Sequence, residues 1–205
     1  LNVLFLFDSI TRFAEAHRET ALLAGETPAL NAFPPSTVRV VSELAERTGP
    51  GTDGKGDITA IYSVLVAGSD MEEPVADMIR GILDGHIILA RDIAERGRYP
   101  AIDILRSVSR SLPHAATDDE NALIRECRRM FALYEEIAPM LRANLYEFGK
   151  DAEADRAIAL YSLLDRYAGT PNGLGIEAAF DRLREILRTE RSLAAQALPA
   201  TPIDP

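Results

Sequence analysis

The sequence predicts an α/β layer followed by an all-α part. Apolar, β-branched runs at residues 3–7, 58–66 and 85–90 are separated by segments with helical spacing, an alternation typical of a mainly parallel sheet. From Asp118 onwards the β-branched runs vanish and helical spacing takes over. We therefore expect an α/β domain over residues 1–114 and a helical domain over residues 115–196. A proline-rich tail, residues 197–205, is expected to be disordered.

The composition limits the classes of protein to which this chain can belong. The chain has 205 residues, a net charge of −10 and a single cysteine. The acidic excess disfavours a nucleic-acid surface, which needs a basic face. A chain with a single cysteine cannot form an intrachain disulfide, and the lack of disulfides fits a protein of the cytoplasm. We find neither a signal peptide nor a run near the roughly 20 apolar residues of a membrane span. Because Leu1 already stands inside a strand, we expect the C-terminal part of a longer protein.

The first apolar run ends in a carboxylate, Asp8. Its continuous apolar character predicts a strand buried on both faces, and open α/β sheets bind ligands at the carboxyl ends of their strands. In a nucleotide-hydrolysing enzyme such an aspartate holds Mg²⁺ directly or through water. The alternative is an N-cap for the next helix. Arg12, one turn later, either reaches the same site or is a surface charge.

The remaining elements follow from helical periodicity and turn residues. The loop at 49–56 is rich in glycine, but Lys55 is followed by Gly56, so it does not match a P-loop. We interpret the acidic stretch 68–74 as a solvated turn. We interpret His86 as a residue that packs within a strand. Helices are expected at residues 11–25, 36–47, 74–83, 120–148 (bent at Pro139), 152–167 and 176–195.

Seven stretches together resemble one family. In order they are Asp8-Ser9-Ile10-Thr11-Arg12-Phe13-Ala14, Phe33-Pro34-Pro35-Ser36, Gly56-Asp57-Ile58-Thr59-Ala60-Ile61-Tyr62, residues 70–77, residues 82–89, Tyr99-Pro100-Ala101-Ile102-Asp103 and Ser107-Val108-Ser109-Arg110. They resemble the rotary-type hexameric ATPases, and within these the flagellum-specific ATP synthases and type III secretion ATPases. The resemblance covers about the first 110 residues, and the helical part matches only loosely.

The resemblance implies a fold and a set of roles. The fold would be the second half of a RecA-like P-loop core with a C-terminal helical domain. Asp8 would be the Walker B carboxylate acting on Mg²⁺, and Tyr99 would stack on the adenine of ATP. Arg110 would be the arginine finger that reaches a neighbouring subunit's γ-phosphate, with Arg12 as a secondary active-site residue. Judged without the family, Tyr99 is a loop tyrosine and Arg110 a loop arginine.

The sequence also departs from the family pattern. Phe33 stands where tyrosine is usual, and Arg98 stands where histidine is common before the adenine-stacking tyrosine. No Gly-x-x-x-x-Gly-Lys-Ser/Thr loop occurs in the 205 residues. The catalytic glutamate and the N-terminal β-barrel of the family are also absent. We therefore expect this chain by itself not to hydrolyse ATP.

The function that the resemblance implies is an ATP-hydrolysing subunit that energises protein export by the flagellar type III secretion apparatus. It would act as a homohexamer at the cytoplasmic face of the apparatus, peripheral to the membrane at most. Its partners would be a central coiled-coil stalk, the export gate, exported proteins and their chaperones, with no nucleic acid. The segment 147–155 is either a stalk-facing tip or a solvated loop. Alternatives are the ATPase of a virulence-type injectisome and a non-catalytic nucleotide-binding subunit.

Overall fold

A computed structural model describes residues 1–29, 33–67, 72–171 and 175–196, with side chains up to residue 188. The predicted tail and residues 68–71 of the acidic turn lie outside the described residues. Internal contacts divide the chain into two compact units, Leu1–His86 and a second that begins at Ile87. The domain boundary expected near residue 114 was inferred from a change in sequence pattern and not from contacts, and it stays a prediction.

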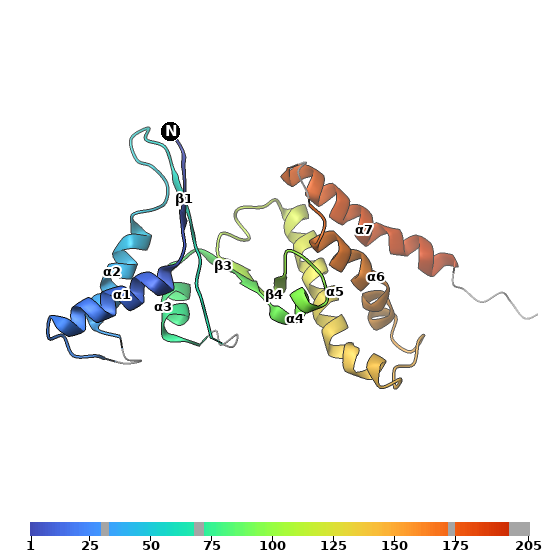
Figure 1. Ribbon diagram of the computed structural model, residues 1–205. Coiled ribbons are helices and arrows are strands. Elements are labelled where there is room, and N and C mark those ends of the chain that lie inside the picture. The colour runs from blue at the N-terminus through green and yellow to red at the C-terminus, as the bar shows by residue number, and fades with distance from the viewer. Residues whose placement is uncertain (30–32, 68–71, 172–174, 197–205) are drawn as a thin grey trace, which may run out of the picture. The chain divides into compact units, whose positions relative to one another are not determined.

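The first unit is built around a parallel pair of strands (Figure 1). Strand β1 pairs with strand β2 in register from Val3 opposite Ile58 to Phe7 opposite Tyr62. Helices α1 and α2 lie between the two strands in the chain, so the connection is the crossover that parallel pairing requires. The elements are β1 (Val3–Phe7), α1 (Ile10–Leu23), α2 (Pro35–Glu46), β2 (Ile58–Tyr62) and α3 (Pro74–Ile82).

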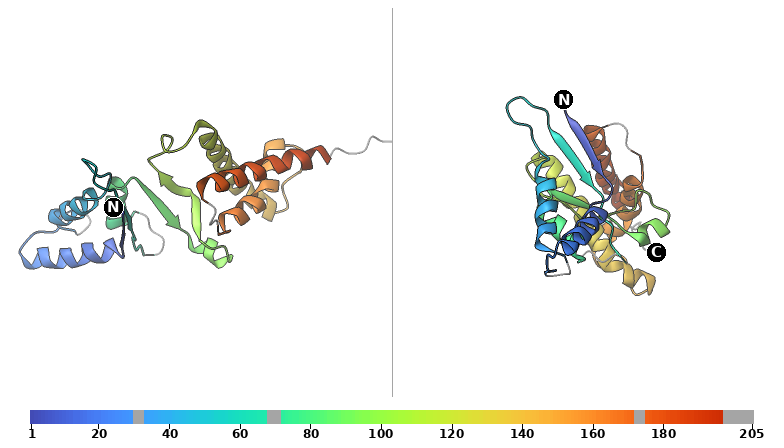
Figure 2. Two further views of the ribbon diagram at one scale, coloured as in Figure 1. Left: turned by 90° about the horizontal axis from the view of Figure 1, so that it is seen from above. Right: turned by 60° about the vertical axis from the view of Figure 1, so that its left-hand side comes forward.

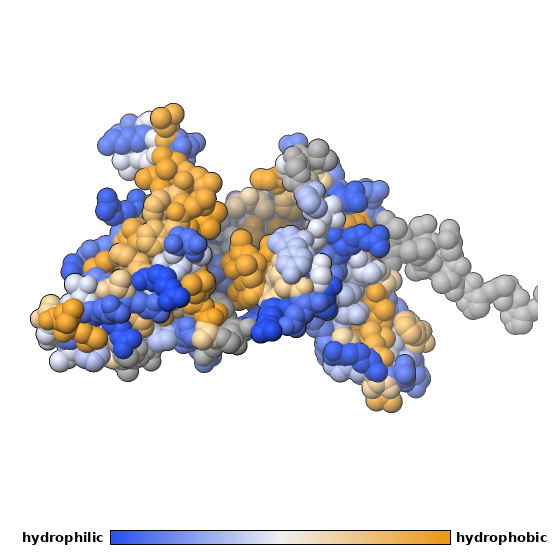
Figure 3. Space-filling model, viewed as in Figure 1, coloured by the Kyte–Doolittle hydropathy of each residue, from blue (hydrophilic) through white to orange (hydrophobic). Residues whose placement is uncertain are grey.

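Only one face of this pair is covered. Phe5 and Phe7 pack against a core to which α1, α2 and α3 all contribute. On the opposite face Leu4, Leu6 and Ile61 are 62%, 65% and 57% exposed, and they contribute to the apolar surface over β1 and β2 in Figure 3. The expectation that β1 is buried on both faces is therefore wrong for the described chain, because the three helices pack on the Phe5 side.

The second unit joins a small sheet to a helical bundle. Strand β3 pairs with strand β4 in a separate two-stranded sheet. The sequence did not predict β4, because Asp103, Arg106 and Ser107 interrupt its apolar pattern. The elements are β3 (Gly85–Leu89), which crosses the division between units, α4 (Arg91–Glu95), β4 (Ile102–Ser109), α5 (Asp118–Arg142), α6 (Ala152–Ala168) and α7 (Ile176–Gln196).

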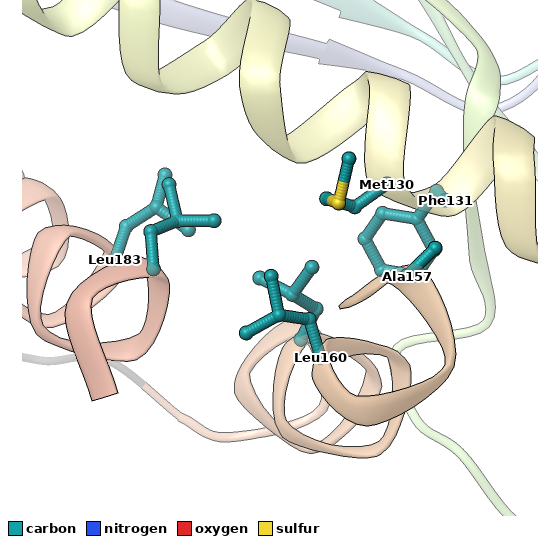
Figure 4. Packing of buried hydrophobic residues seen from close by; sticks show 7 residues of the cluster. Met130, Phe131, Ala157, Leu160 and Leu183 are labelled. Carbon is teal, nitrogen blue, oxygen red and sulfur yellow. The ribbon is translucent and has the colours of Figure 1, made fainter. Parts of the chain in front are cut away.

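The bundle of α5, α6 and α7 has its own apolar core. Met130, Phe131, Ala157, Leu160 and Leu183 converge from the three helices in Figure 4. Helix α5 begins at a capping box formed by Thr117 and Glu120. It ends at Arg142 rather than at the expected residue 148, because Asn144 adopts a positive φ of 54° that stops the helix.

Candidate functional site

Two polar side chains meet at the carboxyl edge of the parallel pair. Asp8 directly follows β1, and Ser63 directly follows β2. The Ser63 hydroxyl donates to the Asp8 carboxylate, and the Ser63 N–H donates to the Phe7 carbonyl at 3.0 Å. Figure 2 shows the two strands side by side, with this edge at their arrowheads. Asp8 is exposed there, in the position where open α/β sheets bind ligands.

The Asp8 carboxylate is not used to cap α1. Ser9 is the N-cap residue, and its hydroxyl accepts a hydrogen bond from the Arg12 N–H at 3.4 Å. The alternative in which Asp8 caps the helix is therefore wrong. Because the neighbouring serine takes over the capping role, the Asp8 carboxylate keeps acceptor capacity for a ligand.

The segment after β2 is attached to the start of α1. The Ile10 N–H donates to the Ser63 carbonyl at 3.0 Å. The Thr11 hydroxyl donates to the Leu65 carbonyl at 3.2 Å and accepts from the Leu65 N–H at 2.9 Å. Strand β1 ends at Phe7, so Ser63 and Leu65 bond to the start of α1 instead of to a strand, and β2 is therefore shorter than the predicted 58–66. These bonds also hold Ser63 beside Asp8.

Arg12 lies one helical turn after Asp8, but its guanidinium pairs with Glu15 at 3.0 Å and its side chain is 73% exposed. This is an ordinary surface ion pair. A role for Arg12 in binding remains a prediction.

Asp8 has the chemistry of a magnesium ligand. Mg²⁺ prefers hard oxygen ligands and commonly takes one or two carboxylates, substrate phosphates and waters. In the described part of the chain no three His, Cys, Asp or Glu side chains gather into a group that could hold a metal ion. The Asp8 carboxylate is one oxygen ligand of the kind that Mg²⁺ takes.

The other two predicted site residues lie in the second unit. Tyr99 stands in the loop between α4 and β4, and its side chain is 66% exposed. Arg110 directly follows β4 and is exposed. An exposed aromatic face can stack on a base, and a guanidinium can neutralise phosphoryl oxygens. The roles of Tyr99 and Arg110 stay predictions.

Sequence reasoning missed the residues that hold these segments in place. Arg98, in the same loop as Tyr99, forms an ion pair with Asp165 of α6 at 2.8 Å. Arg128 of α5 donates to the carbonyls of Ile104, Leu105 and Ser107 in β4. The one available signal was the departure from histidine at Arg98. Ser63 was missed as well, although its position at the end of a predicted strand could have identified it.

Two other features carry no site residue. A cavity of about 550 Å³ in the first unit is lined by residues 45–46, 48–50, 57–60, 62 and 82–85, and none of the predicted site residues line it. Cys127 is partly buried in α5, and burial raises the pKa of its thiol to about 11. A thiol with so high a pKa is a poor nucleophile at neutral pH.

No helix among the described residues has the length and apolar character that a bilayer crossing requires.

Comparison with known proteins confirms the resemblance. Residues 1–109 match the nucleotide-binding domain of the ATP synthase alpha/beta family, and residues 116–169 match the C-terminal domain of the type III secretion ATPase EscN. With the parallel strand pair and its exposed aspartate, this defines an α/β nucleotide-binding core followed by an all-α region. The chain belongs to the ATP synthase alpha/beta family.

Relatives come from both flagellar and secretion systems. The flagellum-specific ATP synthase of Helicobacter pylori is 43% identical over 92% of this chain and 44% of its own length. The SPI-2 type 3 secretion system ATPase of Salmonella typhimurium is 48% identical over 78% of the chain and 36% of its own length. The chain thus spans less than half the length of these relatives.

Solved structures agree with the fold. EscN from enteropathogenic E. coli is 37% identical, and structures of its assembled form match with TM-scores of 0.84 alone and 0.79 in complex with its central stalk EscO. These structures cover 90% of this chain and 45% and 44% of the respective EscN chains.

Proposed function

We propose that this chain is the C-terminal half of an ATPase that energises protein export by a flagellar or related type III secretion apparatus. The observation that carries the proposal is the exposed Asp8 carboxylate at the carboxyl end of a parallel strand pair, held beside Ser63. The family match and the names of the relatives support the same activity.

Each site residue has one task in this proposal. Asp8 binds the Mg²⁺ of ATP directly or through water, with Arg12 as a neighbouring secondary residue. Tyr99 stacks on the adenine ring. Arg110 stabilises the charge on the γ-phosphate oxygens in the transition state, a role worth roughly 10³–10⁵ in rate in other phosphoryl-transfer enzymes. The phosphate-binding loop and catalytic glutamate would come from the preceding segment.

Arg110 would serve a neighbouring subunit, so the working form is a ring. We propose a homohexamer, in keeping with the assembled state of EscN. Head-to-tail contacts close into a ring when the rotation between subunits permits, and each interface then holds one site.

The helical region offers a surface for a stalk. Between α5 and α6 the chain exposes Leu145 and Phe148, 68% and 69% exposed. The Tyr146 hydroxyl, which donates to Asp155 at 2.8 Å, holds the turn together. We propose that this tip contacts a central coiled-coil stalk, by analogy with the EscN–EscO complex. The export gate, the exported proteins and their chaperones are the further partners, and ATP with Mg²⁺ is consumed at the cytoplasmic face.

Two variants of this chain test the shared site. Full-length Asp8→Asn and Arg110→Ala subunits should each assemble and lose ATPase activity, the latter roughly 10³-fold or more. When the two are co-expressed, an Arg110→Ala subunit keeps its Asp8 and a neighbouring Asp8→Asn subunit supplies Arg110. Random mixing in a ring then leaves about a quarter of the interfaces complete, so about a quarter of the activity should return.

Several outcomes would contradict the proposal. If Arg110 served its own subunit, mixing would restore nothing. An inactive wild-type full-length protein that still binds nucleotide would favour the non-catalytic alternative. Arg91→Ala, which removes an exposed arginine paired with Glu95 at 2.8 Å on α4, is the control and should keep full activity. Mg²⁺-dependent turnover by the purified 205-residue chain would refute the expectation that it lacks essential parts.

A further inference from the structure

We propose that Arg98 is a positioning residue that fastens the Tyr99 loop to helix α6, so that the helical bundle controls how well Tyr99 stacks on a base. The inference rests on the adenine-binding role proposed for Tyr99. It assigns a second task to helix α6, which otherwise serves only as part of the bundle.

The Arg98 guanidinium has three partners: two carbonyls that accept hydrogen bonds, and a carboxylate that lies at ion-pair distance from Nε without the geometry of a hydrogen bond. Its Nε pairs with the Asp165 carboxylate at 2.8 Å. Its Nη2 donates to the Ile102 carbonyl at 2.8 Å, and its Nη1 donates to the Pro100 carbonyl at 3.3 Å. The Arg98 side chain is 10% exposed, against 66% for Tyr99. One buried side chain thus connects the backbone on the far side of Tyr99 to a carboxylate on α6.

Backbone contacts also hold the two ends of the loop that carries Tyr99. It leaves α4 at Gly97, which has a positive φ of 81°, and the Arg98 N–H donates to the Ile93 carbonyl at 3.3 Å. It enters β4 at Ile102. Between these two ends, the hydrogen bonds of the Arg98 side chain to the Pro100 and Ile102 carbonyls hold the Tyr99 backbone in position.

The end of α6 fits closely against the same loop. A Cβ atom placed on Gly169, the C-cap residue of α6, would lie 3.2 Å from Arg98 Cγ and 3.5 Å from the Tyr99 carbonyl oxygen. Interiors packed this tightly transmit a displacement rather than absorb it. A shift of α6 would therefore move Arg98 and the Tyr99 backbone together.

The residue type matters at this position. Arginine presents donors in a planar fork that can reach a carboxylate and carbonyls at once. Histidine, by comparison, has only two ring nitrogens and a shorter side chain. It cannot make all three contacts, so this attachment depends on the arginine of this chain.

The test is a double-mutant cycle in the full-length protein. Arg98→Met keeps the aliphatic stem but removes the donors, and Tyr99→Ala removes the ring. Steady-state kinetics with ATP and with tripolyphosphate, which has no base to stack, separate base binding from phosphate binding. Tyr99→Ala should raise the KM for ATP roughly 10-fold, within the range of base–aromatic stacking. Arg98→Met should raise it roughly 3-fold to 10-fold, with kcat and the tripolyphosphate KM nearly unchanged.

If Arg98 acts through Tyr99, the two substitutions will not be additive, and Arg98→Met will add little once the ring is gone. Asp165→Asn should weaken ATP binding in the same direction. The control is Arg96→Met, because Arg96 donates to the Tyr161 hydroxyl of α6 at 3.1 Å and to none of the carbonyls of residues 99–102. It should leave both KM values unchanged.

Other results would overturn the inference. Additive effects on KM, or an Arg98→Met variant whose only change is a lower melting temperature, would show that Arg98 is merely structural. Tyr99→Ala with an unchanged KM for ATP would instead refute the adenine-binding role itself, and the inference would fall with it. The Tyr99→Ala result therefore distinguishes the two failures.

Discussion

Arg128 should be the arginine on which the second unit depends most for stability. From α5 its Nη1 donates to the carbonyls of Ile104 at 2.6 Å and Ser107 at 3.1 Å, and its Nη2 to Leu105 at 2.7 Å. All three acceptors belong to β4, the strand that leads to Arg110. The perturbation we consider is Arg128→Met, which keeps the stem and removes every donor.

The size of the effect follows from these three bonds. Hydrogen bonds to charged groups contribute about 1.5–3 kcal/mol each when they are buried. Arg128 is half-buried, and water can reach part of the carbonyl surface that the substitution frees. We therefore expect a loss of about 2–4 kcal/mol for the three bonds together, well below their full sum.

Urea unfolding followed by tyrosine signals measures this loss. The protein has no tryptophan, and five of its six tyrosines follow residue 87. Tyr134 and Tyr161 stack with ring centroids 3.5 Å apart, so near-ultraviolet circular dichroism reports on the second unit. The unfolding midpoint should fall by about 1–2 M urea. Arg125→Met, on an exposed arginine of the same helix, is the matched control, and an equal shift in both variants would refute the reasoning.

Three further predictions concern the helical bundle. Leu160→Ala should cost about 2–5 kcal/mol because Leu160 is fully buried; an equal loss from the half-buried Leu163→Ala would contradict this in the same urea assay. Hydrogen bonds from the Thr117 backbone and hydroxyl lower the Glu120 pKa below 4.5. That stabilisation is present above the unfolded pKa and is lost as the pH falls through the folded pKa. The melting temperature of wild type should therefore exceed that of Glu120→Gln at pH 7, and this advantage should disappear once the pH is below the folded pKa. Cys127, with a thiol pKa raised to about 11, should react with iodoacetamide at pH 8 roughly 100-fold more slowly than a free thiol; rapid alkylation of the folded chain would show an accessible thiolate.

The sequence was sufficient to predict most of the elements that have a clear local pattern. The apolar run before Asp8, the helical spacing after Asp118 and the glycine that ends α1 each specify an element through residues close in the chain. The family resemblance followed from ordered motifs in the same way, and the comparisons confirm it. Helix ends were less accurate, because a single backbone conformation such as that of Asn144 decides them.

Tertiary structure alone decided which partners the polar side chains choose. Ser63 meets Asp8 because parallel pairing brings the ends of β1 and β2 to one edge, although 55 positions separate them in the chain. Arg98 meets Asp165 only because the loop before β4 packs on α6. Contacts between distant residues leave no periodic trace in the sequence, since they depend on how whole elements pack. The residues of the candidate site could therefore be proposed from the sequence, but the attachments that hold them in place could not.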